Sequence, residues 1–205
     1  MKKVKKIVTL LLCAALLVGA SVAGTVAYLT ADDEVVNTFT VGKVAITLDE
    51  TDVDNSTEGE ERDQANAYRL IPGSTYVKDP IVHVDAESES SWVFVKVVNQ
   101  LTAYEADATT EGTPYTRVAD QIIANGWQEL SDVDGVYYME YTMDQPDKDL
   151  EVFEQFAVAG DLEQGDDWDT AENMTITVTA YAIQKAGFES DLAGAWTAVS
   201  TAGSN

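Results

Sequence analysis

The chain of 205 residues has one cysteine, one histidine and four prolines. Cys13 has no second cysteine to pair with, which excludes an internal disulfide framework. His83 is the only histidine, which excludes an H-E-x-x-H zinc peptidase motif because that motif needs two. A Ser-His-Asp centre would need His83 as its base, and no Gly-x-Ser-x-Gly sequence accompanies it. We therefore expect His83 to be a structural or surface residue of a strand, and we do not expect an enzyme.

Basic residues are also scarce, with 12 Lys and Arg against 36 Asp and Glu. Four of the 12 lie in the first six residues, so the chain beyond residue 27 carries 8 basic against 36 acidic residues, a net charge of −28. A charge this negative repels nucleic acid and anionic lipid. We expect no nucleic-acid partner and an acidic, well solvated surface.

The amino-terminal segment has the layout of a bacterial export signal. Lysines precede an uncharged stretch, Ile7–Ala31, which ends at the acidic residues Asp32 and Asp33. Small residues near position 27 predict cleavage between Ala27 and Tyr28. Residues 1–27 would then be a signal peptide and residues 28–205 a single domain, secreted and in contact with the membrane only before cleavage.

The same segment has two other interpretations. The uncharged stretch exceeds the roughly 20 residues that span a bilayer, so an uncleaved anchor stays open, although Gly19, Ala20 and Gly24 dilute its apolar half. A lipoprotein signal is disfavoured because Leu12, which precedes Cys13, is not small.

The rest of the chain shows the alternation typical of strands. Val44–Leu48 and Met174–Ala182 are apolar at every second position. Trp92–Val98 is apolar at both parities, which predicts a central strand covered on both faces. We expect Phe94 and Val178 to be buried in different strands of one sandwich.

Turns and short helices separate these strands. One strand is expected after the turn Pro72-Gly73 and to run to Asp85, with Pro80 at an edge or bulge. A hairpin is expected from Gly126–Leu130 and Val136–Met143. Two short helices are expected, one at Thr116–Asn125 and one near Phe188–Val199. This organisation predicts an all-β protein, an antiparallel β-sandwich with one or two short helical insertions.

Three stretches of the sequence share features with one known family. They are Gly24–Thr30 with Asn37–Gly42, Leu70–Ser74 with Lys78–Val82 and Trp92–Val97, and Thr175–Gln184 with Gly187-Phe188. Together they resemble the TasA/camelysin family of exported Gram-positive proteins, which a SipW-type signal peptidase processes. Residues 102–170 contribute little to the resemblance.

The resemblance implies a jelly-roll-like sandwich, secretion and, in several members, fibres of the biofilm matrix. We expect a secreted, non-catalytic structural protein of the cell surface or biofilm matrix of a Gram-positive bacterium. Its expected partners are further copies of itself, joined head to tail, other matrix or cell-surface proteins, and the SipW-type signal peptidase. The joining strand would come from the β-prone segment that cleavage frees before Val44. The alternative is a metal-dependent endopeptidase of the camelysin type, although the matching stretches contain no recognised catalytic motif.

Two acidic clusters offer the oxygen ligands that calcium prefers. The denser cluster, around Gly165, is the candidate calcium site and comprises Asp161, Glu163, Asp166, Asp167 and Asp169. The other spans residues 49–61 and is no EF-hand, because Thr57 stands where the sixth position counted from Asp52 requires glycine. The alternative is that both clusters are solvated loops without metal, and no other cofactor is expected.

Overall fold

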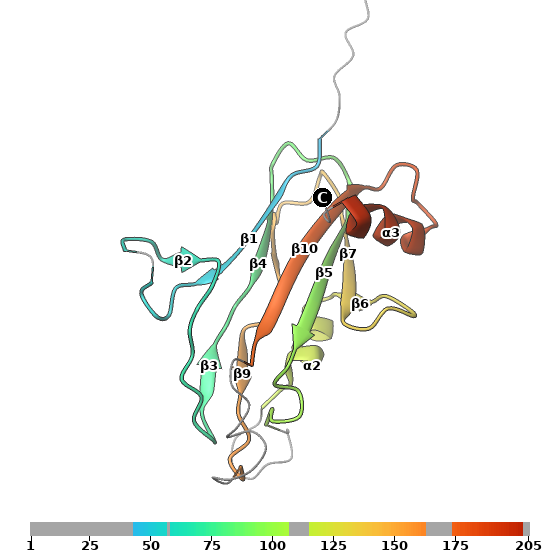
Figure 1. The fold of residues 1–205 in the computed structure, drawn as a ribbon. Helices are drawn as coiled ribbons and strands as arrows, with labels where there is room; N and C mark the ends of the chain where they lie inside the picture. Colours follow the sequence, from blue (N-terminus) through green and yellow to red (C-terminus); the bar gives the residue numbers. More distant parts are fainter. Residues whose placement is uncertain (1–42, 57, 107–114, 163–173, 203–205) are drawn as a thin grey trace, which may run out of the picture. The chain divides into compact units, whose positions relative to one another are not determined.

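The computed structural model describes residues 43–56, 58–106, 115–162 and 174–202 (Figure 1). All of them belong to the compact unit Gly42–Asn205. They form mostly antiparallel β-strands with two short helices, α2 (Val118–Ala124) and α3 (Leu192–Ala202), which agrees with the all-β prediction. Over these same residues, no helix is long and apolar enough to cross a membrane.

The strands form two four-stranded sheets and a small two-stranded one, and every strand pair is antiparallel. The first sheet has the order β2 (Arg62–Asp63), β1 (Ile46–Thr51), β4 (Ile81–Val84), β8 (Asp149–Glu151). The second has the order β10 (Ile176–Gln184), β5 (Ser91–Asn99), β7 (Val136–Tyr141), β6 (Gln128–Glu129). The small sheet pairs β3 (Thr75–Val77) with β9 (Gln155–Ala157).

Both four-stranded sheets contribute side chains to one apolar cluster. Strand β5 contributes Val93 and Val95, and strand β4 contributes Val82 and Val84, all of them buried. Partly buried side chains of β1 and β10 pack against this cluster, namely Ile46, Leu48, Ile176, Val178, Ala180 and Ala182. The inward side chains follow the two-residue period of a strand, so alternation in the sequence determines which face each strand buries.

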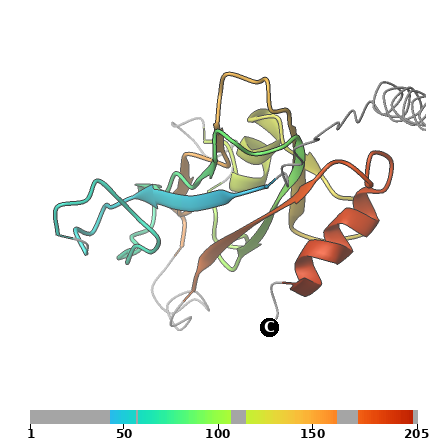
Figure 2. The same cartoon turned by 90° about the horizontal axis from the view of Figure 1, so that it is seen from above.

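Helix α3 packs against the other face of β10 and β5 (Figure 2). The ring of Trp196 lies 5.6 Å from that of Phe94 and 5.2 Å from that of Tyr181, measured between centroids. Phe94 is fully buried, whereas Val98, farther along the same face, is 45% exposed. Strand β5 is therefore covered on both faces from Ser91 to Val95, but Lys96 and Val98 are exposed, so the prediction of a strand covered on both faces holds only for its first part. Phe94 is thus buried as expected, whereas Val178 is only partly buried.

The interpretation of the residues after Pro72-Gly73 as one strand is wrong. Gly73 has a φ of +77°, as the third residue of a type II turn requires. Beyond it, however, the chain forms β3 and then β4, which belong to different sheets. Pro80 lies between them and has no N–H to continue a ladder. The helix and hairpin predictions are confirmed by α2, which ends before Asn125, and by the pairing of β6 with β7.

Candidate functional site

Two strand edges have no partner strand, or only a short one, in the part of the chain that the structure describes. Strand β10 pairs with β5 along its whole length and with no described strand on its other side. Strand β1 pairs with β4 over Ile46–Asp49, while β2 reaches only Glu50 and Thr51 on the far side. Open edges of this kind offer backbone N–H and C=O groups to a further strand.

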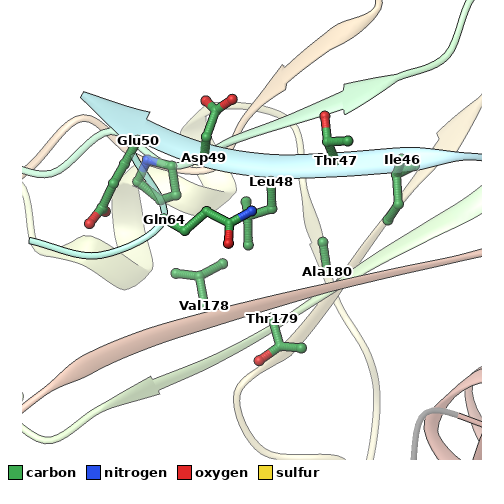
Figure 3. A pocket seen from close by; sticks show the side chains of 10 residues that line it. Ile46, Thr47, Leu48, Asp49, Glu50, Gln64, Val178, Thr179 and Ala180 are labelled. Carbon is green, nitrogen blue, oxygen red and sulfur yellow. The ribbon is translucent and has the colours of Figure 1, made fainter. Parts of the chain in front are cut away.

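A groove with a volume of about 490 Å³ lies between these two edges. Figure 3 shows Ile46 and Leu48 projecting from β1, with Val178 and Ala180 of β10 facing them. The four side chains are partly buried and belong to the rim of the shared core. The groove can therefore receive apolar side chains of an extended segment that pairs with one of the two edges.

A second groove, of about 560 Å³, adjoins the first and shares Gln64 and Val178 with it. Its apolar lining consists of Tyr68, Leu70, Leu101, Phe156, Met174, Ile176 and Val178. The rings of Tyr68 and Phe156 meet edge to face with centroids 5.3 Å apart. The apolar lining thus extends from one end of β10 to its middle residue, Ala180.

Charged side chains cluster on the outer face of the first sheet. The guanidinium of Arg62 donates from Nε to Asp49 at 2.5 Å and from a terminal nitrogen to Asp79 at 3.2 Å. His83 contacts Asp149 through Nδ1 at 2.6 Å and Asp49 through Nε2 at 3.0 Å. The cluster therefore links β2, β1, β4 and β8 side by side.

This geometry favours the protonated imidazole of His83. Burial alone would lower the pKa of His83, but its hydrogen bonds to Asp149 and Asp49 outweigh burial and raise the pKa above the ordinary 6.5. Burial would likewise raise the pKa of Asp49, but hydrogen bonds from Arg62 and His83 outweigh it and lower the pKa. Both ring nitrogens contact carboxylates, so in this arrangement neither can accept a proton from a serine hydroxyl.

Most residues singled out by the sequence as candidate sites lie outside the described residues. Of the candidate calcium ligands only Asp161 is described, and it is exposed. Glu163, Asp166, Asp167, Asp169 and the cleavage residues Ala27 and Tyr28 are not among the described residues. Within the described ranges, no group of three or more His, Cys, Asp or Glu side chains is arranged to hold a metal ion.

Sequence reasoning missed a buried polar cluster at the end of β1. Glu50 is 4% exposed and contacts Lys78 and Asn66. The signal for it was present, because Glu50 continues the inward parity of Ile46 and Leu48. A carboxylate on the buried face of a strand requires polar partners, and these come from segments that the sequence alone does not bring together.

The chain matches no family model, no curated protein and no solved structure.

Proposed function

We propose that this chain is a secreted, non-catalytic structural protein of the cell surface or biofilm matrix of a Gram-positive bacterium. In this proposal it belongs to the TasA/camelysin family and folds as a jelly-roll-like sandwich. Subunits join head to tail when the segment freed by signal cleavage, Tyr28–Val41, enters the groove of another copy. The observation that carries the proposal is the apolar groove between the open edges of β1 and β10.

The freed segment suits this groove in length and in side-chain pattern. Tyr28–Val41 is longer than the nine residues of β10, so it can follow that edge completely. Phe39 and Val41 are two residues apart and share one face of an extended chain. An added strand gains main-chain hydrogen bonds from the open edge of β10 and apolar contacts from the groove. Because each subunit donates its segment to one copy and accepts that of another, the contact is head to tail and produces a linear fibre when successive copies do not close into a ring.

The competing arrangement is that the segment occupies the groove of its own subunit. The chain enters β1 at Ile46, so a segment returning beside β1 must reverse direction within a few residues, close to Gly42. That arrangement fills the same groove and leaves a monomer. Subunit assembly therefore distinguishes the two arrangements, whereas occupation of the groove does not.

The decisive experiment separates the donor from the acceptor. Deleting residues 28–41 removes the donor segment, and Val178→Lys places a long charged side chain in the acceptor groove. Gln184→Lys is the matched control, because Gln184 is an exposed residue at the end of the same strand and lines neither groove. Circular dichroism first establishes that each variant is folded.

The mature protein and Gln184→Lys should form linear assemblies visible by electron microscopy, and neither single variant should. Mixing the two defective variants should produce dimers by light scattering, because one retains the acceptor and the other retains the donor. Fibres of the deleted protein as abundant as those of the mature chain would contradict the proposal, as would a mature chain that stays monomeric at high concentration and high salt.

The metal-dependent endopeptidase stays the alternative, although no observation on the described residues favours it. Zinc content and casein cleavage by the mature protein test it directly. Activity that disappears when zinc is removed would replace the structural proposal.

A further inference from the structure

One carboxylate at the end of β1 joins a lysine and an asparagine. One oxygen of Glu50 lies 2.5 Å from Nζ of Lys78, and the other accepts a hydrogen bond from Nδ2 of Asn66 at 3.0 Å. The side chains of Glu50 and Lys78 are only 5% and 11% exposed. The amine and the carboxamide are thus held at the two oxygens of one buried acid.

The carboxamide of Asn66 is also fixed by the backbone. Its Oδ1 accepts a hydrogen bond from the N–H of Val53 at 2.8 Å, and its Nδ2 donates to the carbonyl of Thr51 at 2.8 Å. A donor at Oδ1 polarises the carbonyl and is placed to stabilise negative charge that develops on this oxygen during attack at Cγ. The hydrogen bond from Nδ2 to Glu50 directs the amide nitrogen at a group that can give it a proton.

We propose that Lys78 and Asn66 become joined by an intramolecular isopeptide bond, with Glu50 transferring the protons. Glu50 takes a proton from Nζ, and the neutral amine attacks Cγ of Asn66 while the N–H of Val53 stabilises the oxygen. A bond forms between Nζ and Cγ, and the bond between Cγ and Nδ2 breaks as Glu50 returns this proton to the departing nitrogen. Glu50 then transfers a second proton from Nζ to the same nitrogen, which leaves as ammonium. The net reaction converts a lysine ammonium and a carboxamide into a secondary amide and ammonium, with no oxidant or cofactor.

Three features of the site favour this reaction over simple ion pairing. The site is largely closed to water, which would otherwise compete with the amine of Lys78 for Cγ of Asn66. Both reacting groups are held in place by one acid, which removes most of the entropic cost of bringing them together. The carbonyl is already polarised before the attack. The carboxylate, the carboxamide and the amine come from three separate segments of the chain. These are β1, the loop after β2 and the connection between β3 and β4.

The bond would act as a staple in a chain whose only cysteine lies in the proposed signal peptide. It would close a covalent loop between Asn66 and Lys78, restricting the unfolded chain as a disulfide does. Both residues line the second groove, so the staple would also stiffen one wall of it. The inference does not depend on fibre assembly, because the reaction needs only one folded subunit.

Mass spectrometry of the folded, secreted protein tests the inference, once its N-terminus has been read. The mass should be one ammonia lower than its sequence requires. Trypsin should release residues 63–69 covalently joined to residues 70–96, uncut at Lys78, because an acylated lysine is not cleaved. A folded protein at its full sequence mass after prolonged incubation, with both peptides free, overturns the inference.

Two side reactions are distinguished by the same measurement. Closure of Asn66 on its own backbone to a succinimide also releases ammonia but joins no peptides, and it would persist in Lys78→Met. A link between Lys78 and Glu50 would release water instead of ammonia. Either result overturns the assignment.

Variants assign the roles. Lys78→Met and Glu50→Gln should both have the full sequence mass, since the first lacks the nucleophile and the second lacks the base. Lys185→Met is the matched control, because Lys185 pairs with Glu140 away from this site, and it should retain the loss of ammonia. Loss of ammonia from folded Glu50→Gln at the rate of the wild type would overturn the role of Glu50. If a variant does not fold, the wild-type mass still decides the inference.

Discussion

At the scale of single residues, the buried carboxylate of Glu105 holds two irregular segments of the chain together. Glu105 is 6% exposed and accepts hydrogen bonds of 2.7 Å from the hydroxyl of Tyr115 and from the backbone N–H of Val118. It thereby attaches the first turn of α2 to the loop after β5. Burial, followed by the hydrogen bond and charge of Glu105, raises the pKa of Tyr115 above its ordinary value.

We predict that Glu105→Ala destabilises the fold, because it leaves two buried donors without an acceptor. The expected loss is about 1–3 kcal/mol in the free energy of unfolding, measured with urea. Glu105→Gln keeps one acceptor oxygen and should lose less. Glu129→Ala, at an exposed position in β6, is the control and should change little. Equal losses for Glu105→Ala and Glu129→Ala would show that Glu105 does not hold this loop.

The histidine makes stability depend on pH. Because contacts with Asp149 and Asp49 raise the folded-state pKa of His83 above 6.5, its contribution to stability is complete below pH 6.5. That contribution is lost as the pH rises through the raised pKa. The urea midpoint should therefore fall between slightly acidic and mildly alkaline pH, and His83→Asn should flatten this dependence. A wild-type midpoint that rises over this interval would contradict the predicted direction.

At the scale of elements, β5 joins the two apolar clusters, since its successive side chains face opposite ways. We predict that Phe94→Ala costs about 3–5 kcal/mol, as removal of a large buried side chain does. Val98→Ala is the matched control, because Val98 lies on the same face of the same strand and is 45% exposed. A loss below about 1 kcal/mol for Phe94→Ala in urea denaturation would mean that α3 does not seal this face.

Elements with strong periodicity could be predicted from the sequence, and elements with weak periodicity could not. Strands β5 and β10 and helix α2 are recognisable because each has a clear apolar pattern and turn residues at its ends. Strands β2, β8 and β9 have two or three residues each, too few to show a pattern, and their pairing depends on distant segments. Pro80 can be recognised in the sequence as a residue that interrupts a strand, but the assignment of β3 and β4 to separate sheets comes from tertiary packing.

The candidate groove was hidden for a related reason. Ile46 and Val178 were identified as inward-facing residues, and alternation alone supports that much. Another strand can fill the space between two inward faces, or a groove can remain there. Which of the two occurs depends on strand order, and one sequence does not specify strand order. The buried cluster of Glu50 was detectable by parity, but its partners Lys78 and Asn66 were not.

At the scale of the whole molecule, charge opposes the assembly that we propose. The mature chain of the proposed function carries a net charge of −28, so two subunits repel each other at low ionic strength. Salt shortens the range of this repulsion, since the Debye length falls from about 10 Å at 0.1 M to about 3 Å at 1 M. We predict that the rate of fibre formation by the mature protein rises with sodium chloride, measured by light scattering and electron microscopy. Calcium chloride at equal ionic strength should act more strongly if Asp161 and its neighbours in the sequence bind the cation. The protein lacking residues 28–41 is the control for nonspecific salting out, because it keeps nearly the same surface and lacks the donor strand. It should remain monomeric at every salt concentration tested.

Two outcomes would show that repulsion between subunits does not govern assembly. One is a rate of fibre formation that does not depend on salt, and the other is aggregation of the deleted protein at the same salt concentrations as the mature chain.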